Sequence, residues 1–313
     1  MGLGAVTNSI KRTDAFANLD DRPSKPTSAV NYLIVGSDSR EGLTRAEQRR
    51  LRTGSTKVAA GKRSDTILLV HISKNRDRAS IVSIPRDSYA LIPRWTDGQG
   101  KVHSETHSKI NSAFAWGGAP LLIQTLESMS DLRIDHYIEV DFASFKNIVN
   151  ALGGVDICFE YPTRDINTGL NVPAPGCYTL DQYQSLAYAR SRYYEVFRDG
   201  AWDVDGRADL GRIERQQIFL QAAISKAIEQ TTANPMRSSE LINAAVNSLT
   251  VDPSLNLIET ADYLKPLASG GVQRYSLSVV PEMVNSKDVL VLGAEAGAVL
   301  AYFAGTAGPP PVG

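Results

Sequence analysis

Apolar runs of strand length come early in the chain and are separated by polar segments. Three of them, at residues 31–35 (NYLIV), 66–72 (TILLVHI) and 79–84 (ASIVSI), predict buried strands. Only a short polar turn separates the second run from the third, so we expect these two to form an antiparallel hairpin. Similar runs at 155–159 and 272–280 predict two further strands.

Apolar residues at helical spacing predict helices between and after these strands. One follows Asn111, others span about 142–152 and 181–189, and a long one runs from Asp209 to about Gln230. Further helices are expected near 238–249, 254–268 and 294–304. Because helices and strands intermix without strict alternation, we expect an α/β fold with three layers, α-β-α, around a central mixed and largely antiparallel sheet.

The remaining segments set the expected domain boundaries. Residues 1–29 are polar and contain proline, which indicates a short helix followed by a tether, and residues 30–308 are expected to form one domain. Residues 41–62 are basic and lack apolar periodicity, which predicts a mobile loop. Residues 309–313 predict a disordered tail, and no apolar stretch approaches the roughly 20 residues of a transmembrane helix.

Charge and cysteine content narrow the possible partners. The net charge of −1 argues against nucleic acid, so the Lys and Arg side chains are expected to act locally. The two cysteines, Cys158 and Cys177, are too few to form a metal site by themselves. They could be buried free thiols, or they could form a disulfide, which would stabilise the folded state by roughly 3 kcal/mol in an oxidising compartment. Composition alone leaves both possibilities open.

Arginine and aspartate gather in short clusters, three of which adjoin the predicted strands. Asp38 follows the first strand, Asp65 directly precedes the second, and Arg86 follows the third. In a hairpin the last two lie side by side, and Asp38 joins them if the first strand is antiparallel to the second. We therefore expect all three at one edge of the sheet. Two more clusters, at 190–192 and 209–217, accompany the helices.

These residue types suit a metal-bound pyrophosphate. Paired carboxylates suit a hard cation such as Mg²⁺, and planar guanidinium forks suit phosphate oxygens. A single Asp is more simply explained as a helix cap or a turn residue, and a single Arg as a solvated surface residue. The expected convergence at one sheet edge favours a shared binding site instead. The candidate metal ligands are Asp38 and Asp65, and the candidate pyrophosphate ligands are Arg63, Arg86, Arg190, Arg192, Arg212 and Gln216. Structural support is expected from Arg40, Asp87, Asp209 and Arg215.

No motif of an activated nucleophile is present. The sequence has no GxSxG elbow, no P-loop, no GxGxxG and no HExxH. Direct in-line transfer is therefore favoured over a covalent enzyme intermediate.

As a set, the clusters resemble the LytR-CpsA-Psr family of cell-wall phosphotransferases. The resemblance covers about residues 30–230 in order. The matching motifs are Val35–Arg40, Arg63–Thr66, Ser83–Asp87, Lys109–Phe114, Leu186–Arg192 and Asp209–Gln217.

The resemblance implies an enzyme on the extracytoplasmic face of the membrane, anchored by an N-terminal helix that would precede the tether. It would move a phosphoglycan from a polyprenyl-pyrophosphate carrier, whose tail enters an apolar tunnel between sheet and helices, to a peptidoglycan hydroxyl. By motif position Asp38 and Asp65 would hold Mg²⁺ or Mn²⁺, and with Arg86 they would be the catalytic residues. Asp38 would also assist deprotonation of the acceptor.

Finer features resemble the actinobacterial members. The cysteine pair and the extra segments at 41–62 and 193–208 imply arabinogalactan as the glycan, and extracytoplasmic placement favours a Cys158–Cys177 disulfide. Two other functions stay open. One is a pyrophosphatase in which water replaces the sugar hydroxyl, and the other is a module that binds polyprenyl lipid or glycan without catalysis. The sequence does not indicate an oligomeric state.

Overall fold

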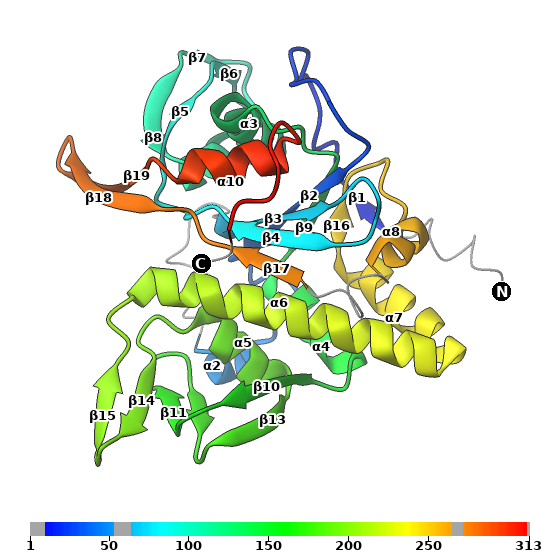
Figure 1. Ribbon diagram of the computed structural model, residues 1–313, viewed down its shortest axis with the longest axis vertical. Coiled ribbons are helices and arrows are strands. Elements are labelled where there is room, and N and C mark those ends of the chain that lie inside the picture. The colour runs from blue at the N-terminus through cyan, green and yellow to red at the C-terminus, as the bar shows by residue number, and fades with distance from the viewer. Residues whose placement is uncertain (1–9, 53–63, 265–271, 312–313) are drawn as a thin grey trace. The chain divides into compact units, whose positions relative to one another are not determined.

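The computed structural model describes residues 10–52, 64–264 and 272–311 (Figure 1). Within these ranges the chain divides into two compact units. Unit 1 comprises Ile10 with residues 39–52 and 141–249, and unit 2 comprises residues 11–38, 64–140, 250–264 and 272–311. The stretch expected to be one domain, 30–308, thus contributes to both units. Each unit is assembled from segments that are distant in the sequence.

Unit 2 is built around a mixed sheet of seven strands in the described part of the chain. In spatial order these are β1 (Lys11–Arg12), β16 (Thr250–Val251), β9 (His136–Val140), β2 (Val30–Ser37), β3 (Ser64–Ile72), β4 (Ala79–Ser83) and β17 (Val272–Tyr275). The predicted hairpin of β3 and β4 is confirmed, and β2 is antiparallel to β3. The α/β class and the mixed sheet are confirmed as well. Antiparallel contacts make up three of the six described pairings rather than a large majority, because β1–β16, β9–β2 and β4–β17 are parallel.

The core of unit 2 lies between this sheet and two helices, α3 (Asn111–Ser130) and α10 (Ala296–Phe303), which supply one of the expected helical layers. Alternate residues of the central strands, such as Leu33 and Val35 or Ile67 and Leu69, point to the same face and are fully buried against the helices. Helix α3 is interrupted at Gly118, whose φ of +66° suits a glycine. Helix α8 (Leu257–Leu264) begins three residues later than expected, and residues 265–268 of that predicted helix lie outside the described residues.

Three small strand pairs complete unit 2. They are β5 (Tyr89–Ile92) with β8 (Thr106–Lys109), β6 (Trp95–Thr96) with β7 (Val102–His103), and β18 (Val279–Val284) with β19 (Lys287–Leu292). The single strand predicted at 272–280 is wrong, since it is divided between β17 and β18. The two halves have different partners, because β17 extends the main sheet and β18 forms a separate hairpin.

Residues 11–29, expected to form part of a tether, belong to the folded unit 2. Strand β1 adds to the sheet edge, and Ala15 is fully buried in the core. Arg22 donates two hydrogen bonds, of 3.0 and 2.6 Å, to the buried carboxylate of Glu127 on α3. These contacts involve residues more than 100 positions apart, so local sequence patterns do not show them. Residues 1–9 of the predicted tether lie outside the described residues.

Unit 1 combines helices with two small sheets. Its helices are α2 (Arg45–Arg50), α4 (Phe142–Ala151), α5 (Gln182–Arg190), α6 (Ala208–Ala233) and α7 (Pro235–Ser248). One sheet pairs β10 (Val155–Phe159) with β13 (Gly176–Leu180). The other has the order β12 (Leu170–Val172), β11 (Thr163–Asp165), β14 (Glu195–Arg198) and β15 (Ala201–Val204).

Helix α2 lies where a mobile loop was expected, so that prediction is wrong for residues 45–50. Thr44 and Glu47 form a capping box, in which each side chain accepts a hydrogen bond from the other's backbone N–H. Leu43 and Leu51, on either side of the helix, are buried against Leu186. Residues 53–62 of the predicted loop lie outside the described residues.

Candidate functional site

In unit 2, Asp65 and Arg86 meet at one end of the sheet. Gly36 of β2 pairs with Thr66 and Ser37 pairs with Ser64, so Asp65 is the extra residue of a β-bulge. Arg86 follows β4 and donates from Nη1 to Asp65 Oδ1 at 2.6 Å. The predicted convergence of these two residues is confirmed.

Asp38 lies at the same end of the sheet by its backbone register, since it directly follows the Ser37–Ser64 pair. A Cβ at Gly36 would lie 2.9 Å from Thr66 Cβ, which explains why β2 carries glycine beside the bulge. Arg63, predicted to bind pyrophosphate, lies outside the described residues.

Asp87 is the centre of an ion-pair network that holds the turn after β4. One of its oxygens lies 3.4 Å from Arg86 Nε, and the other lies 2.9 Å from Lys109 Nζ. Its backbone carbonyl accepts a hydrogen bond of 2.9 Å from the N–H of Leu290 on β19. These contacts are the kind expected of a supporting residue. The motif at Lys109–Phe114 singled out Lys109, but it did not show that Asp87 is its ion-pair partner. No sequence signal indicated that Leu290 would contact Asp87.

A second arginine cluster lies in unit 1, around the start of α6. Asp209 Oδ2 accepts a hydrogen bond of 3.1 Å from Arg212 Nη2, while Asp209 Oδ1 lies 3.0 Å from Arg212 Nη2 and 3.1 Å from Arg192 Nε. Arg212 is only 2% exposed, and such a buried charge requires a paired carboxylate. The i, i+3 spacing of Asp209 and Arg212 therefore produces the predicted shared face of the helix.

Helix α6 is joined to the end of α5 by two further side chains. Gln216 donates to the carbonyl of Ala189 at 3.0 Å, and Arg215 donates to the carbonyl of Ser191 at 2.8 Å. Ser191 has an extended backbone, so α5 ends at Arg190, whose guanidinium donates to the carbonyl of Leu51 at 2.8 Å.

These contacts support the predicted structural role of Arg215, but they do not test the predicted ligand roles of the other residues. Arg215 has the contacts of a structural residue. Gln216 is buried against backbone, and its predicted role as a pyrophosphate ligand stays a prediction, as do those of Arg190, Arg192 and Arg212. Arg40, predicted as structural support, lies just after β2 and is partly buried.

Asp205 is a supporting residue that sequence analysis missed. It accepts from Arg215 Nη1 at 3.2 Å and from Arg207 Nε at 2.9 Å. Burial by itself would raise the pKa of Asp205. The hydrogen bonds from Arg207 and Arg215 together lower the pKa by more than burial raises it, so the pKa lies below its usual value. The acidic character of residues 193–208 was the available signal, but the signal did not indicate which arginine this carboxylate supports.

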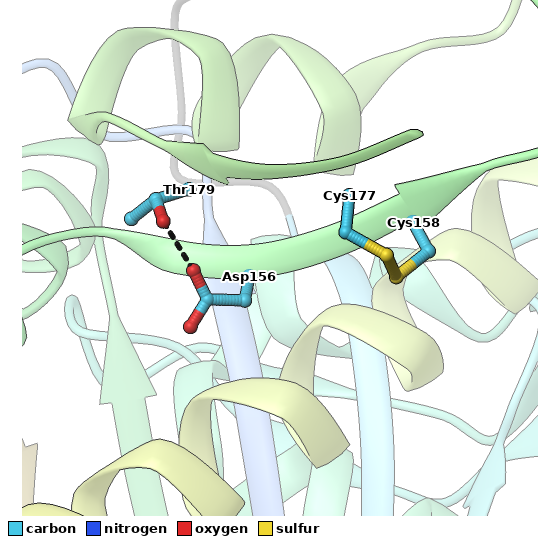
Figure 2. Close-up of a disulfide and its surroundings, with 4 residues drawn as sticks. All are labelled: Asp156, Cys158, Cys177 and Thr179. Carbon is cyan, nitrogen blue, oxygen red and sulfur yellow. Dashed lines mark hydrogen bonds between the residues drawn. A yellow bond between two sulfur atoms is a disulfide. The ribbon is translucent and has the colours of Figure 1, made fainter. Parts of the chain in front are cut away.

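The predicted disulfide is confirmed in unit 1. Cys158 on β10 and Cys177 on β13 are register partners, with Cα atoms 3.9 Å apart (Figure 2). On the same pair of strands Thr179 donates a hydrogen bond to Asp156, which lies opposite it (Figure 2). The disulfide and this hydrogen bond both hold the β10–β13 register.

The described residues hold no cluster of three or more His, Cys, Asp or Glu placed for a metal ion. None of the described helices is long and apolar enough to cross a membrane. Asp38 and Asp65 supply two carboxylates at one sheet end, and Mg²⁺ commonly uses one or two carboxylates with water and phosphate oxygens. The donor chemistry therefore fits the predicted cation.

Comparison with known proteins gives consistent matches. The model of the LytR_cpsA_psr family matches residues 4–301. The probable cell wall biosynthesis protein LcpB of Corynebacterium glutamicum is 37% identical over 226 residues, which cover 72% of this chain and 49% of LcpB. The polyisoprenyl-teichoic acid–peptidoglycan teichoic acid transferase TagU of Oceanobacillus iheyensis is 30% identical over 242 residues, 75% of this chain and 62% of TagU. The chain thus spans 49% of the length of LcpB and 62% of the length of TagU.

Among solved structures, a LytR-Csp2A-Psr enzyme from Actinomyces oris superimposes with a TM-score of 0.68 at 22% identity. The match covers 94% of this chain and 96% of that one. This likeness establishes the fold.

Proposed function

The chain belongs to the LytR-CpsA-Psr family, and we propose that it transfers a phosphoglycan from a polyprenyl-pyrophosphate carrier to a hydroxyl group of peptidoglycan. The names of its relatives, cell wall biosynthesis proteins and teichoic acid transferases, support this proposal. The observation that carries it is the Asp65–Arg86 pair at the sheet end, because it joins a candidate cation ligand to a phosphate-binding fork at 2.6 Å.

In unit 2, Asp38 and Asp65 are the residues proposed to hold Mg²⁺ or Mn²⁺. When bound there, the cation would neutralise pyrophosphate charge and help the phosphate leave. Arg86 would bind a phosphate oxygen while its position is set by Asp65 and Asp87. Lys109 would act through Asp87, since its ammonium group pairs with that carboxylate.

In unit 1, the arginines proposed to bind pyrophosphate are held by neighbours. Asp209 pairs with Arg192 and Arg212, and it therefore limits the rotamers that these long side chains adopt. Preorganised donors stabilise developing charge more effectively than mobile ones, because they need not reorient during the reaction.

The proposed reaction is a single in-line displacement. The acceptor hydroxyl oxygen forms a bond to the phosphorus that carries the glycan, and the bond from that phosphorus to the bridging pyrophosphate oxygen breaks. The products are the phosphoglycan–acceptor diester and polyprenyl phosphate, and Asp38 takes the hydroxyl proton. An apolar tunnel for the polyprenyl tail would add affinity without affecting the bond changes.

An extracytoplasmic location, with a membrane anchor in the full protein, is part of the proposal. The Cys158–Cys177 disulfide supports it, because disulfides persist mainly in oxidising compartments. Arabinogalactan is the proposed glycan, supported by the corynebacterial relatives that are named as cell wall biosynthesis proteins.

The test is a transfer assay with polyprenyl-pyrophosphate arabinogalactan oligosaccharide, Mg²⁺ and peptidoglycan oligomers. Arg86→Ala and Asp65→Ala should each lower transfer about 100-fold or more, since each removes a group that acts on the transition state. Arg86→Lys keeps the charge but loses the fork, and it should also be impaired. Lys25→Ala is the matched control, because it breaks another 2.6 Å ion pair of unit 2, that with Asp135.

Each result discriminates between the candidate functions. Product linked to peptidoglycan that both alanine variants abolish, and that the control retains, supports transfer. Polyprenyl phosphate released without acceptor product supports the pyrophosphatase. Lipid or glycan binding without turnover, equal in all variants, supports a binding module. Removal of divalent cations by a chelator should abolish transfer, and addition of Mg²⁺ should restore it.

A further inference from the structure

The four-stranded sheet of unit 1 has one outward face that carries aromatic side chains. Phe197 on β14 lies directly opposite Trp202 on β15, and Glu195 lies opposite Val204. Residues two apart in a strand share a face, so these four side chains lie together. Arg164 on β11 is the register partner of Glu195 and shares that face. We name this set, Arg164, Glu195, Phe197, Trp202 and Val204, the sheet platform.

At β11 and β12 the other face of the same sheet is buried. Thr163 and Val172, which are register partners, are 1% and 2% exposed. By contrast Phe197, Trp202 and Val204 on the platform are 37%, 36% and 53% exposed. Folding alone therefore does not account for the aromatic side chains of the platform. Exposed apolar groups that are clustered in this way mark interaction surfaces.

Contacts within the sheet platform hold its side chains in position. The guanidinium of Arg164 lies 3.9 Å from the centre of the Trp202 ring, and its Nε lies 2.6 Å from Glu195. The rings of Phe197 and Trp202 are 5.4 Å apart, centre to centre. A surface that is ordered before binding loses little entropy when a ligand arrives.

The charges of the sheet platform are balanced. Its one cation, Arg164, pairs with its one anion, Glu195. A polyanion such as a phosphate-rich polymer would gain nothing from such a surface, whereas a neutral ligand with many hydroxyl groups would. Aromatic rings attract the polarised C–H groups of a sugar ring, and the carboxylate and guanidinium beside them bind hydroxyls.

We propose that the sheet platform binds the neutral glycan chain of the acceptor, a strand of β-1,4-linked N-acetylated hexosamines. The identity of this ligand rests on the proposed function, in which the donor is held through its pyrophosphate. The acceptor carries no pyrophosphate, so it needs a separate surface of neutral polar and aromatic groups. Phe197 and Trp202 stack on its sugar rings, and Arg164 orients the indole.

The binding experiment uses the hexamer of β-1,4-linked N-acetylglucosamine as probe, titrated into the whole chain by calorimetry. Trp202→Ala should weaken binding about tenfold, the effect of losing one stacked ring, and Phe197→Ala should act in the same direction. Tyr161→Ala is the matched control. Tyr161 is 40% exposed and precedes β11, outside the residues that form the sheet platform, so its loss should leave binding unchanged.

A second measurement needs no destabilising variant. The chain has 3 tryptophans, so 5-fluorotryptophan labelling gives three fluorine resonances, and only that of Trp202 should shift during the titration. Trp202→Phe assigns that resonance. A hexamer that does not bind, or that shifts the other two resonances instead, overturns the proposal. So does binding of a neutral galactan oligosaccharide in place of the hexamer, since that result assigns the sheet platform to the donor.

Transfer kinetics separate failure of this proposal from failure of the proposed function. If the sheet-platform proposal and the proposed function are both correct, Trp202→Ala raises the acceptor KM about tenfold with little change in kcat. Arg86→Ala then abolishes transfer while the hexamer still binds. Normal transfer with an unchanged acceptor KM in Trp202→Ala overturns the sheet platform alone. Binding of the hexamer at Trp202 without transfer by the wild type overturns the proposed function and supports the sheet platform.

Discussion

Acid should destabilise unit 2 through one buried histidine, His71 on β3. The ring is 4% exposed and lies beside the rings of Tyr302 and Phe303, at 5.1 and 5.4 Å. Its Nδ1 lies 2.8 Å from Asn31 Oδ1. The amide of Asn31 donates to the carbonyls of Arg133 and Phe303, so Oδ1 must accept, and Nδ1 of the neutral ring carries the proton.

Burial lowers the pKa of His71 from 6.5 to about 4, against a smaller opposing effect of Asp135. Between these values the unfolded chain binds a proton that the folded protein does not. Stability therefore falls as the pH drops through 6.5 and stops falling, for this group, below about 4. A tenfold change in proton affinity is worth about 1.4 kcal/mol, so the whole effect is about 3 kcal/mol and the part lost between pH 7 and pH 5 is about 2 kcal/mol.

Urea unfolding at pH 7 and pH 5, with the disulfide intact, measures this difference. His71→Gln retains a donor for Asn31 but does not titrate, so its unfolding free energy should change by about 2 kcal/mol less than that of the wild type between the two pH values. Contributions of all other groups are common to both proteins and cancel. Equal pH dependence in the two proteins would refute the reasoning, whatever the stability of the variant at pH 7.

Three further predictions concern contacts distant in the sequence. Arg22→Ala leaves the buried carboxylate of Glu127 without its charged partner and should cost about 3 kcal/mol in urea unfolding; a loss under 1 kcal/mol would mean that this ion pair does not hold the N-terminal segment. Replacing Cys158 and Cys177 by serine should lower the unfolding free energy by up to about 3 kcal/mol while the circular dichroism spectrum is retained, and loss of the spectrum would contradict a purely stabilising role. Asp209→Asn leaves two arginines without their shared carboxylate and should cost about 2 kcal/mol and weaken pyrophosphate binding, measured by calorimetry; unchanged values of both would remove Asp209 from the supporting set.

Local pattern was sufficient where partners are close in sequence. The β3–β4 hairpin follows from two apolar runs and a short turn, and it brings Asp65 beside Arg86 without any further information. The polar face of α6, with Asp209 and Arg212 one turn apart, follows from helical spacing in the same way. The relative positions of these residues depend only on the geometry of one strand pair or one helix, and the spacing of residues in the sequence is sufficient to predict that geometry.

Tertiary structure decided the contacts that join distant segments. Nothing local shows that β1 pairs with β16, that Leu290 binds the carbonyl of Asp87, or that Gln216 is occupied by the carbonyl of Ala189. The strand at 155–159 was evident, but its register with β13, and hence the Cys158–Cys177 disulfide, depended on the folded pair. A buried polar group takes whichever partner the packed chain brings within hydrogen-bonding distance, and burial makes that pairing obligatory without determining in the sequence which partner it will be.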